Sequence, residues 1–94
     1  MPEEDLEVTQ EIDVKMAAKI AMNYFDELFG GPYADLTLEE VEKKGVVWYL
    51  TLGYNPGRKL GGTIVIPPNA TRQYKLLLVN AINGEVESMK VRRM

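Results

Sequence analysis

Residues 80–89 read NAINGEVESM, and this stretch decides more of the fold than any other part of the chain. Asn83-Gly84 stands between an apolar run and a segment in which apolar and polar residues alternate. Asn-Gly is the strongest short-range hairpin signal, because a type I′ turn needs positive φ at both central residues. The stretch therefore predicts two strands joined by a two-residue turn.

A two-residue turn also fixes which residues of the two strands face each other. It pairs Leu76 with Val91 and Leu78 with Met89 on one side of the sheet. Burial of these four apolar side chains under a helix would contribute roughly 1.5–3 kcal/mol each. The same register places a mixed set on the opposite side, made of the cations Lys75, Lys90 and Arg92 and the apolar Leu77 and Val79.

A long amphipathic helix is predicted before the sheet. Apolar residues recur at steps of three and four over residues 14–28, with charged residues on the opposite side. Thr9 is a suitable N-cap, and Gly30-Gly31 supplies a left-handed stop. Residues 1–8 are acidic and are predicted to form a flexible lead-in to a single domain over residues 9–94.

Strand signals follow the helix. Residues 36–38 and 41–43 look strand-like, and Lys44-Gly45 looks like a turn. Residues 46–54 are the richest in aromatic and β-branched side chains and predict the strongest strand. Its even-numbered residues form the side that meets the core, which leaves Val47 and Tyr49 on the other side.

The segment 57–70 separates this strand from the hairpin. It holds the apolar residues Ile64 and Ile66 between glycines and prolines, which indicates an edge strand or a protruding arm. One long N-terminal helix packed on a four- to five-stranded antiparallel sheet is an α+β fold with two layers.

The order of these elements resembles the cystatin-like wrap, and the ending YKLLLVNAINGEVESMKV resembles PepSY domains. Those domains close with a Tyr-rich strand, an Asp or Asn, a Gly-centred turn and a short Val-rich strand. The resemblance covers residues 12–93 and implies a non-catalytic domain, of a kind associated with inhibiting peptidases or modulating proteins at the cell surface. The matching positions are Tyr74, Asn80, Gly84, Val86 and Val91, with Trp48-Tyr49-Leu50 where the family's second strand usually lies.

The composition argues against catalysis. The sequence contains no cysteine and no histidine, which excludes a thiolate nucleophile, a zinc–thiolate site and the usual general base near neutral pH. No catalytic residue, metal ligand or cofactor is predicted. The carboxylates of Glu39, Glu40 and Glu42 are the alternative, as an enzymatic or small-ligand site.

Charge is distributed unevenly along the chain. Residues 1–45 hold twelve acidic and four basic side chains, a net of −8, whereas residues 46–94 hold seven basic and two acidic ones, a net of +5. Packing of an acidic helical half beside a basic sheet half explains this pattern, and a basic surface that binds an anionic partner is the alternative. Nucleic-acid binding is not predicted, because the sequence shows no recognition motif and its isoelectric point is low, at about 4.9.

The function predicted from these patterns is a non-catalytic protein-interaction or regulatory module, because one helix cannot cover all of the apolar surface. A homodimer or another protein partner would satisfy that surface. The chain shows no signal-peptide pattern and no apolar run near the roughly 20 residues of a membrane span, so a cytoplasmic location without membrane binding is expected. The predicted partner surface consists of Lys75, Leu77, Val79, Lys90, Arg92, Ile64 and Ile66.

Overall fold

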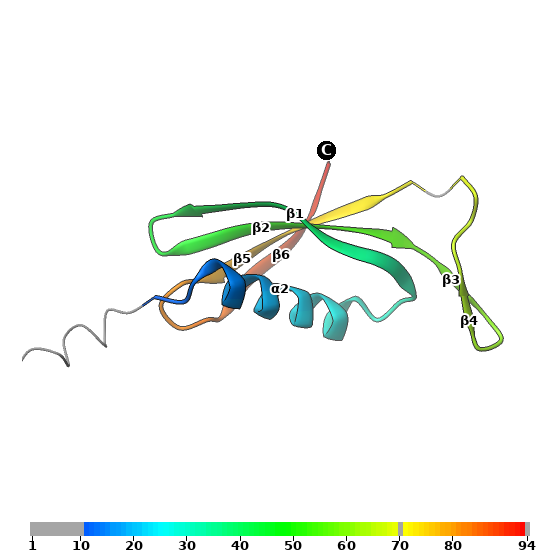
Figure 1. Ribbon diagram of the computed structural model, residues 1–94, viewed down its shortest axis with the longest axis horizontal. Helices are drawn as coiled ribbons and strands as arrows, with labels where there is room; N and C mark the ends of the chain where they lie inside the picture. The colour runs from blue at the N-terminus through cyan, green and yellow to red at the C-terminus, as the bar shows by residue number, and fades with distance from the viewer. Residues whose placement is uncertain (1–10, 70, 94) are drawn as a thin grey trace, which may run out of the picture.

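The computed structural model describes residues 11–69 and 71–93 (Figure 1). Within them, one helix packs on one side of a four-stranded antiparallel sheet of order β1-β2-β5-β6, and β3 and β4 form a separate two-stranded hairpin. The α+β class and the helix-on-sheet arrangement predicted from the sequence are therefore confirmed. The elements are α2 (Val14–Phe29), β1 (Tyr33–Lys44), β2 (Val47–Pro56), β3 (Arg58–Leu60), β4 (Thr63–Val65), β5 (Gln73–Asn80) and β6 (Val86–Arg92).

Local sequence defines both ends of α2. The Asp13 side chain accepts a hydrogen bond from the Met16 backbone N–H at 2.9 Å and so acts as the N-cap. Gly30 ends the helix in the left-handed region, with φ of 73°. The expected N-cap Thr9 and the expected lead-in 1–8 lie outside the described residues.

The strand β1 is continuous and includes residues 36–38 and 41–43, both of which were predicted to be strand-like. Two register shifts interrupt its pairing with β2, one between Ala34 and Thr37 and one between Leu38 and Glu40. Each shift adds unpaired residues to β1 without ending it, as a β-bulge does. The turn that follows uses Gly45 and Val46, one residue later than predicted.

The pairing of β5 with β6 differs by one residue from the predicted register. The Asn80 N–H donates to the Glu85 carbonyl at 2.8 Å, and five residues (81–85), not two, connect the strands. The Asn80 side-chain oxygen holds this longer loop by accepting from the backbone N–H groups of Ile82 at 2.8 Å and Asn83 at 3.2 Å. Gly84 lies in the left-handed region, with φ of 75°.

This change of register exchanges the two sides of β5. Leu77 and Val79, predicted to face away from the helix, are fully buried in the core, whereas Leu76 and Leu78 lie on the other side and are half-buried. The prediction for those four residues was wrong, because a shift of one residue moves every side chain of a strand to the opposite side. In β6, Met89 packs against the core as predicted, but Val91 is 66% exposed.

The core lies between α2 and the sheet. Burial of apolar side chains of this size contributes roughly 1.5–3 kcal/mol each. Aromatic rings of Phe25, Phe29, Tyr33 and Tyr54 close one end of the core, with centroids 4.8–6.4 Å apart. The fully or almost fully buried members are Ala17, Ala21, Phe25, Leu50, Leu52, Tyr54, Leu77 and Val79.

The hairpin β3–β4 projects from the end of β2, away from the sheet and helix (Figure 1). It lies within the predicted arm 57–70, and we call residues 58–65 the arm. Leu60 is 60% exposed and Ile64 46% exposed, so this two-stranded hairpin presents apolar side chains to solvent.

Candidate interaction surface

The side of the sheet opposite α2 is covered by no other element of the described chain (Figure 1), and we call it the open face. Residues that pair directly across antiparallel strands share a side of the sheet, so the register identifies its members. They are Thr37, Glu40, Glu42 and Lys44 of β1, Val47, Tyr49, Thr51 and Gly53 of β2, Tyr74, Leu76, Leu78 and Asn80 of β5, and Ser88, Lys90 and Arg92 of β6.

The open face has an apolar middle and a charged perimeter. The two central strands contribute apolar side chains, of which Tyr49, Leu76 and Leu78 are half-buried. The solvent-facing side of an antiparallel sheet is usually polar, so half-buried apolar residues at its centre are unusual for a surface exposed only to water. The predicted placement of Val47 and Tyr49 away from the core is confirmed.

Arg92 crosses the open face from β6 to β1. Its guanidinium donates to the Thr51 hydroxyl at 2.8 Å and forms an ion pair with the Glu40 carboxylate at 2.9 Å. Thr51 is only 1% exposed although it faces away from the helix. Arg92 therefore covers part of the middle of the sheet and gives the buried Thr51 hydroxyl a hydrogen-bond partner.

A depression of about 630 Å³ lies beside this crossing. Lys44 borders it, with its ammonium 5.1 Å from the Tyr49 ring centroid and 3.9 Å from the Glu42 carboxylate. These exposed contacts are individually weak, so the border of the depression can rearrange around a partner. Its lining consists of Glu40, Val41, Glu42, Lys44, Tyr49, Thr51, Leu76 and Arg92.

Arg72 organises the end of the open face that lies nearest the arm. It donates to the Glu39 carboxylate at 2.9 Å, to the Asp35 backbone carbonyl at 3.0 Å and to Asn55 at 3.2 Å. Asp35 has φ of 57°, a conformation that is uncommon outside glycine. One guanidinium thus ties the two bulges of β1 to β2.

The electrostatic effect of this cluster is concentrated on Glu39. Its pKa lies below the ordinary value, first because the Thr37 hydroxyl donates a hydrogen bond to it and second because the Arg72 guanidinium does so. On the helix side of the sheet, the Tyr33 hydroxyl donates to Asp26, which raises the pKa of Tyr33 to about 12. Both groups are held in one protonation state near neutral pH.

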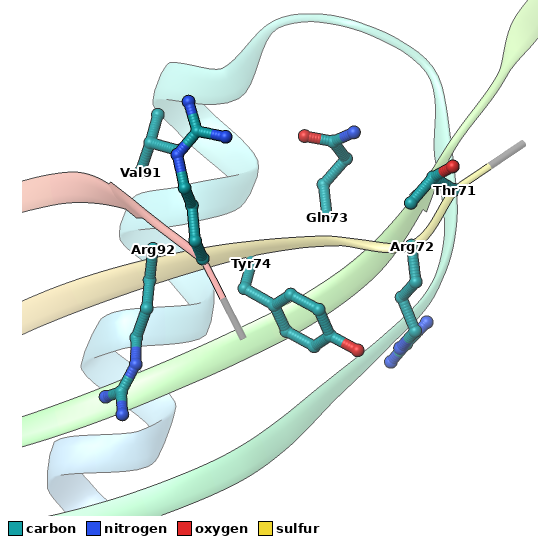
Figure 2. Close-up of a pocket in the computed structure, with 7 residues that line it drawn as sticks. Thr71, Arg72, Gln73, Tyr74, Val91 and Arg92 are labelled. Carbon is teal, nitrogen blue, oxygen red and sulfur yellow. The ribbon is translucent and has the colours of Figure 1, made fainter.

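A second depression, of about 670 Å³, lies where β5 begins and β6 ends. Figure 2 shows Arg72, Tyr74 and Arg92 on one side of the two strands and Gln73 and Val91 on the other. Two of the three arginines that line this depression, Arg72 and Arg92, have carboxylate partners, so Arg72, Arg92 and Arg93 are not a cluster of three unpaired cations.

The predicted partner surface is only partly assembled. Leu77 and Val79 cannot contact a partner, because both are fully buried under α2. Lys75 pairs with Leu52 on the helix side of the sheet, whereas Lys90 and Arg92 lie on the open face. The three cations therefore do not form the single cluster that the predicted register required.

The two predicted residues of the arm have different environments. Ile64 is exposed, whereas Ile66 is half-buried and packs beside Gly57, where an added Cβ would meet its side chain at 3.0 Å. Ile64 thus stays a candidate contact, and Ile66 fixes the base of the arm.

The alternative site at Glu39, Glu40 and Glu42 does not converge. Glu39 pairs with Arg72, Glu40 pairs with Arg92, and Glu42 lies near Lys44. Among residues 11–69 and 71–93, no three His, Cys, Asp or Glu side chains are placed to hold a metal ion. Each of these carboxylates has a cation of its own nearby, so the three do not form one enzymatic or ligand-binding site.

The fold and the surface define the class as a small α+β domain in which a helix covers one side of the sheet. The chain matches no known family model, no curated protein and no solved structure. In the described part of the chain, no helix combines the length and the apolar character needed to cross a membrane.

Proposed function

We propose that this chain is a non-catalytic protein-interaction module that binds its partner through the open face and the arm. The observation that carries the proposal is the apolar middle of the open face, which no other described element covers. A contiguous apolar patch with a polar perimeter is the usual composition of a protein-binding surface.

The side-chain types at the centre support this function. Tyr49 and Arg92 belong to the residue types that contribute most to binding at protein interfaces. Leu76 and Leu78 lie beside them in neighbouring rows of the same sheet, so the apolar area is continuous. The charged residues stand at the two outer strands, where they would determine orientation more than affinity.

The arm supports the same function. A two-stranded hairpin has marginal stability in water when nothing packs against it. Here β3 and β4 pair with each other alone, and Leu60, Ile64 and Val65 are exposed. Packing of these side chains on a partner would both stabilise the arm and extend the contact. A non-catalytic regulatory role also agrees with the PepSY-like resemblance of the sequence, and membership of that family is part of this proposal.

The test is photo-crosslinking in cells that produce the chain. A photoreactive phenylalanine analogue replaces Tyr49 on the open face, Leu60 in the arm or, as a control, the exposed Lys19 on the outer side of α2. We expect discrete adducts, with another protein or with a second copy, from positions 49 and 60 and none from position 19. Equal labelling at all three positions, or none at any, would contradict the proposal.

A further inference from the structure

We infer that the partner of the open face is a second copy of this chain, related by a two-fold axis that runs parallel to the strands. This inference rests on the proposed function, because it names the occupant of the same surface. In this arrangement β1 of one copy lies over β6 of the other, and the two sheets form a sandwich.

The distribution of charge across the open face favours this symmetry. On the open face, the outer strand β1 carries the carboxylates of Glu40 and Glu42 beside one cation, Lys44, and the opposite outer strand β6 carries the cations Lys90 and Arg92. A two-fold axis parallel to the strands places the acidic edge of one copy over the basic edge of the other. An axis perpendicular to the strands would place β1 over β1 and β6 over β6, and the carboxylates of β1 would then have no cation of β6 opposite them.

The pairing register makes the complementarity specific. One row across the sheet runs Glu40, Thr51, Leu76, Lys90, as the three pairings define. Reversal of this row by the two-fold axis sets Glu40 over Lys90, and it sets the position of Thr51, which the Arg92 side chain covers, over Leu76. Each contact occurs twice, because the interface is isologous.

The adjacent rows behave in the same way. The row Glu42, Tyr49, Leu78, Ser88 places the aromatic ring of Tyr49 over Leu78 of the second copy. In the last row, Lys44 of β1 would face Glu87, whose carboxylate reaches this end of the open face by accepting from Asn80 at 2.9 Å.

The available area is sufficient for a weak dimer. Strands about 4.8 Å apart and about eight residues long give an open face on the order of 500 Å² per copy, or about 1,000 Å² in total. This is near the lower limit of a specific interface, so the dimer should be concentration-dependent. The ion pair of Arg92 with Glu40 is already formed within each copy, so neither charge enters the interface without a partner.

The experiment uses the purified full chain alone, in sedimentation velocity runs from about 1 to 500 µM at low salt. Lys44→Glu and Glu87→Lys should each weaken the dimer about tenfold, because each substitution occurs in both copies and so breaks two ion pairs. The double variant Lys44→Glu/Glu87→Lys should recover the parent affinity to within about threefold, since the charges are exchanged rather than lost. Lys19→Glu and Glu27→Lys on the outer side of α2 make the same changes of net charge and should have little effect.

The outcomes are distinguishable. A monomer at every concentration overturns the inference, and a dimer that the double variant fails to restore overturns the proposed axis. Circular dichroism verifies that each variant is folded. If the chain is monomeric while position 49 crosslinks a different protein in cells, the second-copy inference fails and the interaction function stands; if neither is seen, both fail.

Discussion

Leu77→Ala and Leu76→Ala form a matched pair that tests the observed register. Leu77 is 0% exposed and pairs with Leu50 inside the core, whereas Leu76 is half-buried on the open face. Loss of a fully buried leucine leaves a cavity and costs about 3 kcal/mol, whereas the half-buried one should cost about 1 kcal/mol. For a domain of this size the free energy of unfolding is on the order of 5–14 kcal/mol, so the first change is a large fraction of the total.

Urea unfolding followed by circular dichroism gives the comparison. It is run at low micromolar concentration, so that self-association does not add to the apparent stability. Leu77→Ala should lower the midpoint at an unchanged slope, and its melting temperature should fall by about 12–24 °C at about 4–8 °C per kcal/mol. Leu76→Ala should lower the melting temperature by about 4–8 °C. If Leu76→Ala costs as much as Leu77→Ala or more, Leu76 rather than Leu77 faces the helix and the observed register is wrong.

Two further predictions concern the polar contacts. One tyrosine should ionise with a pKa of about 12 in a spectrophotometric titration, and Tyr33→Phe should remove that step. Because the folded pKa lies above the ordinary value of 10.0, the hydrogen bond to Asp26 stabilises the fold fully below pH 10, and this stabilisation is lost as the pH rises through 12. A normal titration of all tyrosines would contradict this. Arg72→Lys should cost about 1 kcal/mol, because an ammonium cannot make the forked contacts with Glu39 and its neighbours. In this variant the pKa of Glu39, followed by NMR, should move up toward its ordinary value. Because that pKa is lowered in the parent, the contribution of Glu39 to stability is present above its unfolded pKa and is lost as the pH falls through its folded pKa. An unchanged titration of Glu39 would count against the role of Arg72.

Periodicity predicted the elements that are long and half-buried. The three- and four-residue steps of α2 identified the side that buries Ala17, Ala21 and Phe25. Alternation along β2 identified Leu50 and Leu52 as core residues in the same way. These signals are reliable because many residues of one element report the same orientation.

Details fixed by single side chains were not predictable from the pattern. The loop between β5 and β6 depends on one carboxamide, Asn80, whose hydrogen bonds with Ile82 and Asn83 compete with the two-residue turn that Asn83-Gly84 favours. The consequence was large, because a shift of one residue exchanged Leu76 for Leu77 in the core.

The candidate surface was predicted in the same partial way. Tyr49 followed from strand alternation, and Lys90 and Arg92 were placed on the correct side of the sheet. Arg72 carried no signal, because its partners Asp35 and Glu39 lie more than thirty residues earlier in the chain. Such long-range polar contacts depend on the finished sheet rather than on local sequence.

The bulges of β1 have a consequence for how sheets of this protein can grow. An outer strand with regular, unpaired backbone groups is a template for further strands, and bulges disrupt that template. With Arg72 holding both irregularities in place, β1 is a poor acceptor, whereas β6 pairs regularly from Ser88 to Arg92. Lateral joining of two molecules through β6 would therefore terminate after one step, and the repeated addition that leads to fibres is blocked at the other edge.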